Sequence, residues 1–299
     1  MLKAGIDIGT NTILMVVGKR GEDGRWTVIE DQHRIARLGE GLDASGLINE
    51  AAIERALAIL ADYRRRCSEL GVSNIDVVAT SAIRSATNGS AVRTKLERVL
   101  SAPIEVLSGQ DEALLTFSGV AADFDNPCSL IDIGGGSTEY ISGFSRIVFT
   151  SISMEFGAVR FTERFGLGSL PTSENVQKAQ NVVQRALASV GRDLKRSAPN
   201  DIIAVAGTPT SLAILDLGLT SFDKDKIEGH VLSAEAVSYW AYRLLRMSQQ
   251  ERSLLPGIDA NRVDILPAGA LILDESLKAL EYERCVVSVR GLRYGVMLR

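Results

Sequence analysis

Cysteine, histidine and aromatic residues are scarce in this sequence. Its 299 residues include 3 Cys and 2 His, and Phe, Tyr and Trp together make up 5%. Cys67, Cys128 and Cys285 lie far apart, whereas metal sites built from cysteine and histidine need closely spaced ligands. We therefore expect three structural thiols that behave as small buried hydrophobic groups.

Long apolar runs and an excess of positive charge are also missing. No run approaches the roughly 18 residues that span a membrane, and the amino terminus lacks the pattern of a secretory signal. The formal net charge is −4, which argues against general nucleic-acid binding. The 45% of hydrophobic residues is enough for one large domain or two ordinary ones. These features predict a cytoplasmic protein with neither a membrane nor a nucleic acid as partner.

Secondary-structure signals occur twice in the same order. Each copy begins with three strands joined by tight turns and continues with alternating helices and strands. The expected strands lie in 2–31 (three strands), 75–81, 103–109, 128–152 (three strands), 201–207 and 284–291. The expected helices cover 50–70, 90–100, 110–122, 157–166, 173–196, 208–217, 233–247 and 262–280.

The repeated order predicts two related lobes. With Asp132 as the counterpart of Asp7, the two copies are offset by 125 residues. The expected fold is α/β, with one lobe in 1–123 and the other in 124–299. No linker rich in Pro, Ser or Gly separates them, so we expect close packing and a hinge near 122–127.

Each copy opens with an Ile-Asp-Ile-Gly unit followed by small residues. The first reads "AGIDIGTNT" (4–12) and the second "LIDIGGGSTEY" (130–140). A dinucleotide-binding loop is excluded, because the third glycine of its fingerprint is missing and strand-forming residues follow where a helix should begin. The run therefore predicts a hairpin turn. Successive backbone N–H groups in such a turn can hold an anion, and its hydroxyl side chains add donors.

Asp7 and Asp132 stand near the end of the first strand of each copy. A carboxylate repels a bare phosphate, so an acid at this place suits a site in which a divalent cation lies between the two. One such turn alone is more often a tight hairpin capped by its aspartate. Two copies in register within a duplicated chain favour a site for phosphate and a metal ion.

Paired turns of this kind resemble those of the actin, sugar kinase and Hsp70 superfamily, whose members bind a phosphate chain between two lobes. A closer similarity is carried by "GIDIGTNTILMVV", "VVATSAIRSATN", "IEVLSGQDEALLTFSGV", "LIDIGGGSTEY", "GAVRFTERF" and "AVAGTPTS". In order and spacing these segments resemble the exopolyphosphatase and guanosine pentaphosphate phosphohydrolase (Ppx/GppA) family. The resemblance implies two actin-like (ribonuclease H-like) lobes with a cleft between them, in the short form without a further helical domain.

The resemblance also implies hydrolysis of the terminal phosphoanhydride of inorganic polyphosphate, with Mg²⁺ as cofactor and Mn²⁺ as a substitute. By motif position Glu112 is the catalytic base, although the acid before it, Asp111, departs from the family's glutamate. Arg84 matches the arginine that grips the substrate. The turns and the resemblance together give as phosphate-binding residues Thr10, Asn11, Thr12, Gly134, Gly135, Gly136, Ser137, Thr138, Gly207 and Thr208. The expected metal ligands are Asp7, Asp132 and Glu139.

Other functions fit parts of this pattern. Guanosine pentaphosphate presents the same terminal anhydride, so a guanosine pentaphosphate 5′-phosphohydrolase acting on guanosine polyphosphate is the alternative. An actin-like ATPase or kinase is more distant, because "AGTPTS" offers one glycine where nucleotide-binding relatives usually have two. A non-catalytic nucleotide sensor is disfavoured by the acid at position 112. A homodimer is compatible with either phosphohydrolase.

Several of these residues also have simpler interpretations. Glu112 could only stabilise a helix dipole, and Arg84 could form a surface salt bridge. His230 is most simply a hydrogen-bonded side chain. Weaker candidates for a basic path along the cleft are Arg160, Arg262, Arg290 and Arg293.

Overall fold

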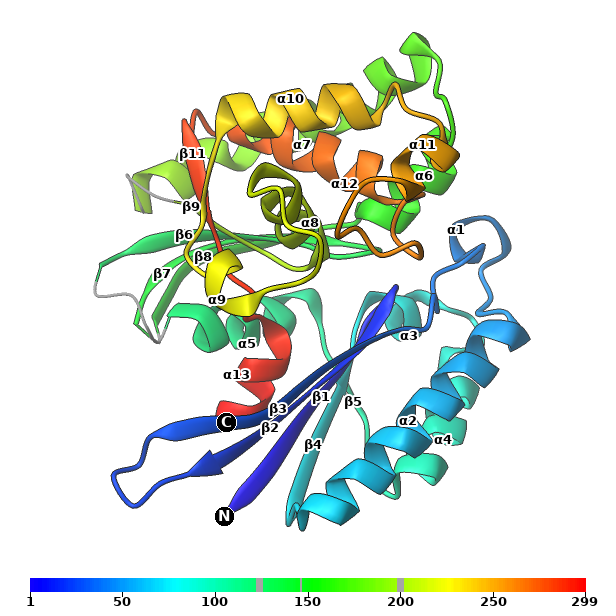
Figure 1. Ribbon diagram of the computed structural model, residues 1–299, viewed down its shortest axis with the longest axis vertical. Helices are drawn as coiled ribbons and strands as arrows, with labels where there is room; N and C mark the ends of the chain where they lie inside the picture. Colours follow the sequence, from blue (N-terminus) through cyan, green and yellow to red (C-terminus); the bar gives the residue numbers. More distant parts are fainter. Residues whose placement is uncertain (122–125, 146, 198–201) are drawn as a thin grey trace. The chain divides into compact units, whose positions relative to one another are not determined.

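The computed structural model describes residues 1–121, 126–145, 147–197 and 202–299 (Figure 1). Contacts within the chain group into two compact units, Met1–Gly119 with Leu292–Arg299, and Val120–Gly291. The hinge expected at 122–127 falls largely outside the described residues, and a lobe boundary at residue 123 stays a prediction. Within the described residues, no helix combines the length and hydropathy that a membrane crossing requires.

The first unit is built on a five-stranded mixed sheet of order β3-β2-β1-β4-β5. Its strands are β1 (Leu2–Ile8), β2 (Thr12–Arg20), β3 (Trp26–Ile35), β4 (Asn74–Ala79) and β5 (Glu105–Val106). Its helices are α1 (Leu42–Ser45), α2 (Glu50–Leu70), α3 (Ser81–Ser85), α4 (Gly89–Leu100), α13 (Leu292–Leu298) and most of α5 (Gly109–Ala121). The central strand β1 is antiparallel to β2 and parallel to β4.

Helix α2 shows how the sequence determines one of these elements. It begins at an N-cap, where the Asn49 side chain accepts a hydrogen bond from the Ala52 amide (2.8 Å). It ends at Gly71, whose φ of 69° favours glycine. The apolar stripe of the helix is buried, and Tyr63 within it donates to the carbonyl of Ile13 (2.9 Å). The helix predicted over 50–70 is confirmed.

The second unit repeats this plan on a six-stranded sheet of order β10-β11-β9-β6-β7-β8. Its strands are β6 (Cys128–Ile133), β7 (Thr138–Phe144), β8 (Ile147–Met154), β9 (Ile202–Val205), β10 (Val231–Ser233) and β11 (Arg284–Val287). Its helices are α6 (Ala158–Phe165), α7 (Ser173–Ser197), α8 (Gly207–Asp216), α9 (Lys224–Ile227), α10 (Ala234–Leu244), α11 (Gln249–Ser253) and α12 (Leu266–Ala279).

The two sheets match strand by strand. Read from β8, the order β8-β7-β6-β9-β11 reproduces β3-β2-β1-β4-β5, with antiparallel pairs first and parallel pairs after the central strand. The second sheet adds only β10, which pairs antiparallel with β11. The predicted α/β fold of two related lobes is therefore confirmed.

Each unit has its own hydrophobic core. Buried helix α12 runs through the core of the second unit, against α7 and α10 (Figure 1). The three cysteines are free and buried, as expected of structural thiols. Burial raises the pKa of Cys67 and Cys128 to about 11 and that of Cys285 to about 12, so all three remain protonated at neutral pH.

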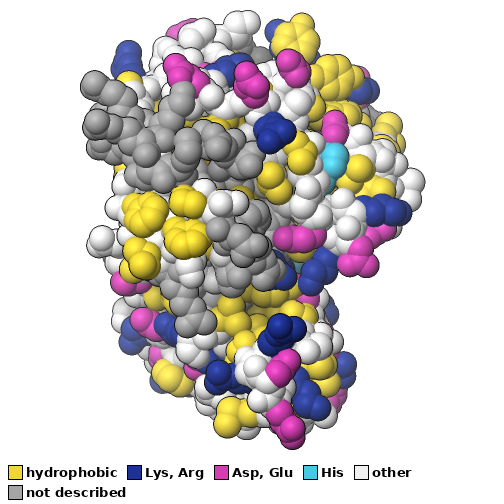
Figure 2. Space-filling model, turned by 90° about the vertical axis from the view of Figure 1, so that its left-hand side faces the viewer, with side chains coloured by type: hydrophobic (Ala, Val, Ile, Leu, Met, Phe, Trp, Pro, Cys, Tyr) yellow, Lys and Arg dark blue, Asp and Glu magenta, His cyan; other side chains and the backbone are white. Residues whose placement is uncertain are grey.

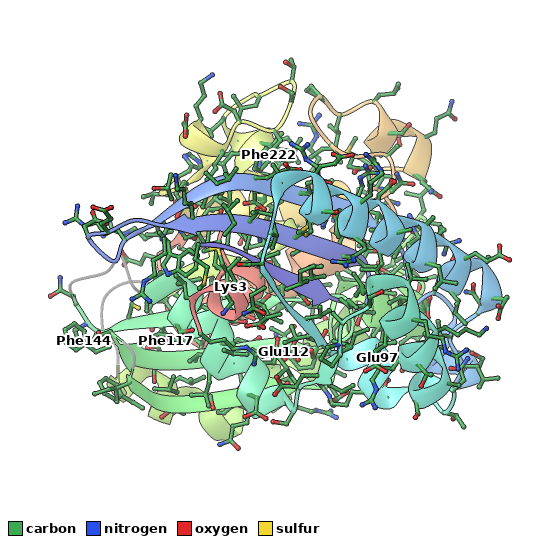
Figure 3. The ribbon with its side chains drawn as sticks, turned by 90° about the horizontal axis from the view of Figure 1, so that it is seen from below. Lys3, Glu97, Glu112, Phe117, Phe144 and Phe222 are labelled. Atoms are coloured by element: carbon green, nitrogen blue, oxygen red, sulfur yellow. The ribbon has the colours of Figure 1, made fainter. Side chains whose placement is uncertain are left out.

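The carboxy-terminal helix α13 completes the first unit. Lys3 on β1 donates to the carbonyl of Arg299 (2.6 Å; Lys3 is labelled in Figure 3). Arg293 pairs with both carboxylate oxygens of Asp31 on β3 (2.7 and 3.0 Å). A Cβ at Gly5 would lie 2.5 Å from the Arg293 carbonyl oxygen, so only glycine at this position of β1 lets the helix approach. Residues at the two ends of the chain thus form one packed layer.

The edge strands of the two sheets differ in charge. In the first sheet, β3 carries acidic and basic side chains, which discourage pairing with another strand. In the second sheet, β8 has no charged residue, and Ile147 and Phe149 are 65% and 51% exposed. Figure 2 shows one face on which hydrophobic side chains reach the surface among charged ones. Of these two edge strands, β8 is therefore less protected against pairing with another strand. The homodimer stays a prediction.

Candidate active site

The β1–β2 turn of the first unit carries four of the predicted site residues. Asp7 lies near the end of β1 and is 9% exposed, and the turn closes with a bond from the Gly9 amide to the Thr12 carbonyl (2.9 Å). Backbone amides of the segment after β3 donate to the carbonyls of Thr10 and Asn11 at 2.8–3.0 Å. These hydrogen bonds hold the β1–β2 turn against the segment that follows β3.

Asn11 has a buried hydrogen-bond donor. Its residue is 6% exposed, and in the described part of the chain its Nδ2 atom has no hydrogen-bond partner. A buried donor left without an acceptor costs about 1–3 kcal/mol. An oxygen-rich ligand such as a phosphate would recover that cost, which agrees with the phosphate contact expected of Asn11.

The β6–β7 turn of the second unit has the same closure. The Gly134 amide donates to the Ser137 carbonyl (3.0 Å), as Gly9 does to Thr12 at the corresponding position. Ser137 and Thr138 are 2% and 0% exposed. The repeat read from the sequence therefore extends to the hydrogen bonding of the turns.

Helix α6 holds the carbonyl groups of the second turn. The amides of Ala158 and Val159 donate to the carbonyls of Gly134 and Gly135 (both 2.9 Å). These are amides that the first turn of a helix leaves without intrahelical partners. Carbonyl groups engaged in this way are removed from contact with an anion. The Gly134 amide closes the turn, so the amides of Gly135 and Gly136 are the glycine donors suited to phosphate oxygens. Sequence reasoning missed this support, because the segment "GAVRFTERF" does not show which carbonyls its first amides bind.

Gly157 permits that close contact, and its substitution gives a test. A Cβ at this position would lie 2.6 Å from the Gly134 oxygen and 2.6 Å from the Gly135 carbonyl carbon. Gly157→Ala should therefore displace the turn, lower the free energy of unfolding by about 1–3 kcal/mol, and weaken the affinity for orthophosphate measured by calorimetry. Gly71→Ala, at the end of α2, should lose stability without a change in that affinity. Unchanged phosphate affinity in Gly157→Ala would contradict this role of the turn.

Arg84 and Glu112 lie in contact within the first unit. Arg84 belongs to α3, directly after β4, and Glu112 lies in the first turns of α5 (Figure 3). The Nη1 atom of Arg84 donates to Oε2 of Glu112 (3.0 Å) and to the Leu107 carbonyl (2.7 Å). The side chains are 23% and 10% exposed, so this is no surface ion pair. The pair therefore sets a guanidinium and a carboxylate in direct contact within the first unit.

Asp111 has a separate, structural role. Its backbone amide donates to Oγ of Ser108 (3.1 Å), and that hydroxyl donates back to the Asp111 carboxylate (2.6 Å). The pair caps the start of α5. The departure at position 111 therefore leaves Glu112 as the buried acid of this motif.

Asp132 and Glu139 form an acidic pair on the second sheet. They are direct partners in the β6–β7 register, so their side chains stand on the same face. Glu139 is 1% exposed and accepts a hydrogen bond from Ser153 (2.7 Å). Opposed carboxylates repel each other unless a cation or a proton lies between them.

This donor set fits the expected metal. Mg²⁺ is commonly held by one or two carboxylates together with substrate phosphates, rather than by a cage of protein ligands. Among the described residues, no group of three or more His, Cys, Asp and Glu side chains could hold a metal ion. Asp132 and Glu139 are compatible with the two-carboxylate arrangement. Asp7 belongs to the other unit, and its role as a ligand stays a prediction.

A second anion site is indicated at the start of α8. Ala206, between β9 and α8, has a φ of 77°, which costs a non-glycine residue about 1–3 kcal/mol. Gly207 and Thr208 follow in the first turn of the helix, where backbone amides favour anions. A side chain at Gly207 would overlap the guanidinium of Arg262, which therefore lies against this helix end. Burial lowers the pKa of Arg262, so an anionic ligand would stabilise its charge.

The structure gives other contacts to several weaker candidates. His230 pairs with Asp216 (2.8 Å), as the simpler interpretation expects. Arg160 pairs with Glu155 (2.8 Å). Arg293 is bound to β3 through Asp31, as described above. Of the four arginines proposed for a basic path, Arg262 has its guanidinium against Gly207, whereas Arg160 contacts Gly135 through its backbone amide (3.1 Å).

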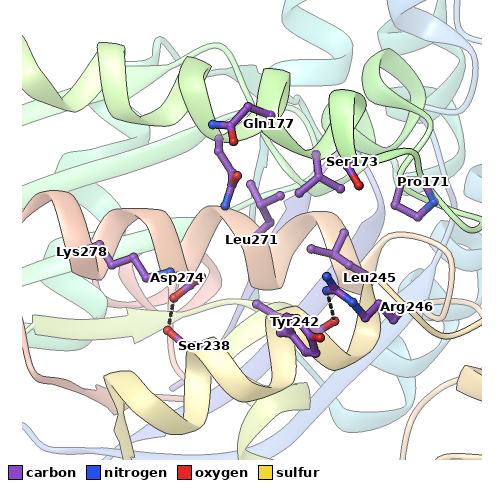
Figure 4. A pocket seen from close by; sticks show the side chains of 13 residues that line it. Pro171, Ser173, Gln177, Ser238, Tyr242, Leu245, Arg246, Leu271, Asp274 and Lys278 are labelled. Atoms are coloured by element: carbon purple, nitrogen blue, oxygen red, sulfur yellow. Dashed lines mark hydrogen bonds and ion pairs between the residues drawn. The ribbon is translucent and has the colours of Figure 1, made fainter.

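A pocket of about 510 Å³ lies in the second unit between α7, α10 and α12 (Figure 4). Its lining includes Asp274, which accepts hydrogen bonds from Ser238 and from Lys278 (2.6 Å). None of the residues predicted for catalysis, phosphate binding or metal binding lines this pocket. The candidate site residues therefore remain the β1–β2 turn and the Arg84–Glu112 pair in the first unit, and the β6–β7 turn and the start of α8 in the second unit.

Comparison with known proteins agrees with these features. The model of the Ppx/GppA phosphatase family matches residues 16–299. Exopolyphosphatase 2 of Mycobacterium tuberculosis is 31% identical, over 99% of this chain and 97% of its own length. A crystal structure of the Aquifex aeolicus Ppx/GppA family member superposes with a TM-score of 0.83 at 29% identity, covering 100% of this chain and 96% of that one. An exopolyphosphatase from Cytophaga hutchinsonii gives 0.89 at 25% identity, over 99% and 96% of the two chains. The chain therefore belongs to the Ppx/GppA phosphatase family.

Proposed function

We propose that this protein is a cytoplasmic exopolyphosphatase that removes the terminal phosphate of inorganic polyphosphate. The contact between Arg84 and Glu112 carries the proposal: a guanidinium, which we assign to phosphate binding, lies 3.0 Å from a carboxylate, which we assign as the proton acceptor. The names of relatives that span the whole chain support this substrate class. Phosphoanhydride hydrolysis needs mainly an oriented water molecule and neutralised oxygens, and both can be supplied by side chains of these types.

In the proposed reaction, Glu112 orients a water molecule and accepts its proton. The water oxygen forms a bond to the terminal phosphorus while the bridging P–O bond breaks, and the electron pair of that bond leaves with the shortened polymer. The guanidinium of Arg84 donates hydrogen bonds to the phosphate oxygens, which it can bind through two parallel N–H groups. The amides of the β6–β7 turn hold further oxygens. Asp132 and Glu139 would hold Mg²⁺, or Mn²⁺ in its place, which neutralises phosphate charge.

The second candidate is a guanosine pentaphosphate 5′-phosphohydrolase. The family model that matches the chain includes both names, and both substrates end in the same anhydride. The same base and phosphate contacts would serve either one. A kinase and an actin-like ATPase are less well supported, because "AGTPTS" offers one glycine where nucleotide-binding relatives usually have two. A non-catalytic nucleotide sensor would leave the buried acid Glu112 without a specific role.

Substrate choice is tested by phosphate release from polyphosphates of graded length, guanosine pentaphosphate and ATP, measured side by side. With net charge −4, the protein must gather arginines locally to hold a polyanion. We expect kcat/KM to rise over the first several phosphates and then level off, and to fall as salt screens the exposed contacts. Rates that ignore chain length but require guanine would favour the alternative. A rise in kcat/KM that continues to chains of hundreds of phosphates would contradict this expectation, because it requires binding contacts with many more phosphates.

A further inference from the structure

Arg252 is a fully buried arginine outside the predicted site. It lies in α11, is 0% exposed and ranks among the largest buried side chains of the described residues. Its Nη1 atom donates to the carbonyl of Val263 (2.6 Å), and its Nη2 atom donates to the carbonyl of Gly168 (2.7 Å). Burying a cation is costly. A buried guanidinium that bonds to two backbone carbonyls therefore implies that the positions of those two backbone segments matter.

The first of these carbonyls belongs to the turn that carries Arg262. Val263 directly follows Arg262, whose amide donates to Asp259 (2.8 Å) and whose carbonyl accepts the amide of Leu266 at the start of α12 (2.9 Å). The turn therefore has its own backbone bonds at both ends. Arg252 adds a bond beside the residue whose guanidinium lies against Gly207.

The second carbonyl belongs to the segment that leaves α6. Gly168 stands two residues after the C-cap of α6, and a side chain there would meet the Asp264 carbonyl at 3.3 Å. The other end of α6 holds the carbonyls of the β6–β7 turn. Arg252 thus bonds both to the turn that carries Arg262, which lies against the start of α8, and to the segment after α6, the helix that binds the β6–β7 turn. All of these residues belong to the second unit.

We propose that Arg252 is a positioning residue for phosphate binding: it fixes the turn at 259–265 so that Arg262 stays against the start of α8. This inference rests on the proposed function, since it assigns Arg262 to the bound phosphate chain. Replacing Arg252 by an apolar residue removes the hydrogen bond from its guanidinium to the Val263 carbonyl, which lets Arg262 move. The affinity for a phosphate chain should then fall although Arg252 itself touches no ligand.

The test measures binding of inorganic tripolyphosphate by calorimetry, in a Glu112→Gln background that does not consume it. Arg252→Met should raise Kd about tenfold, the scale of one lost hydrogen bond to a charged group. Arg252→Lys, which keeps the charge but not the fork, should give a smaller rise and guards against misfolding of the methionine variant. Arg262→Met should weaken binding as Arg252→Met does. Arg243→Met, at an exposed position of α10, is the control and should bind normally.

Coupling separates positioning from general support of the fold. If Arg252 acts through Arg262, the double variant should bind only about as weakly as Arg262→Met, since two substitutions that remove the same interaction are not additive. Fold changes that multiply, or Arg252 variants that bind normally despite a lower Tm, would overturn the inference. Binding is measured without turnover, so a wild-type protein that releases no phosphate would count against the proposed function alone.

Discussion

Glu112→Gln should lower kcat by about 10²–10⁴-fold while the protein remains folded. The substitution keeps the shape of the side chain and its acceptor for Arg84, but it removes the group that takes a proton from water. KM should change far less, because the amides and arginines that hold phosphate are untouched. Steady-state phosphate release and a thermal unfolding curve measure the two effects on the same preparation.

Asp111→Asn is the matched control for this substitution. It also changes an acid to its amide, one residue before Glu112. The Asp111 carboxylate is bound to Ser108 in the helix cap (2.6 Å) and not to Arg84. Stability should shift slightly and kcat should remain within a few-fold of wild type. Activity of Glu112→Gln within tenfold of wild type would remove Glu112 from the role of base.

Exhaustive chelation should abolish phosphate release, and Mg²⁺ or Mn²⁺ should restore it. Hard cations prefer oxygen ligands, and Asp132 and Glu139 present opposed carboxylates on one face of the sheet. Asp132→Asn should raise the Mg²⁺ concentration needed for half-maximal rate by more than about tenfold, since one of two charged ligands is lost. A magnesium titration of each variant gives this value directly.

Glu155→Gln supplies the comparison for the metal experiment. Glu155 is an exposed acid that pairs with Arg160 (2.8 Å), outside the Asp132–Glu139 pair. Its substitution should leave the Mg²⁺ requirement unchanged. Full activity after removal of all divalent cations would overturn the metal assignment for the whole site.

Local sequence signals were enough for most of the elements that position the site. The stripe and caps of α2, the hairpins of each lobe and the helix after Pro267 follow from periodicity, caps and turns. Strand β5 is shorter than the predicted 103–109, because Ser108 already caps α5 and ends the extended segment. The short helices α3 and α11 were missed, since one or two turns give too little periodicity to detect.

Contacts between distant segments could not be read in this way. The resemblance pointed to Arg84 and Glu112 separately, but their hydrogen bond joins α3 to α5 and is seen only in the folded unit. Arg252 was not singled out, because its partners are backbone carbonyls, which every residue carries. The need for glycine at position 157 was not detected either, because it comes from contact with Gly134 and Gly135, 22 to 23 residues earlier.

The order of synthesis follows from the contribution of α13 to the first unit. Residues 292–299 are made long after β1 and β3, yet they cover β1 and bind β3. Between Gly119 and Leu292 the ribosome must add 172 residues, which takes about 10–30 s at about 5–20 residues per second. During that time the surface of β1 around Gly5 lacks its covering helix. The unit that emerges first is therefore the last to reach its native form, and a nascent chain that stops before residue 292 leaves it open to chaperones and proteases.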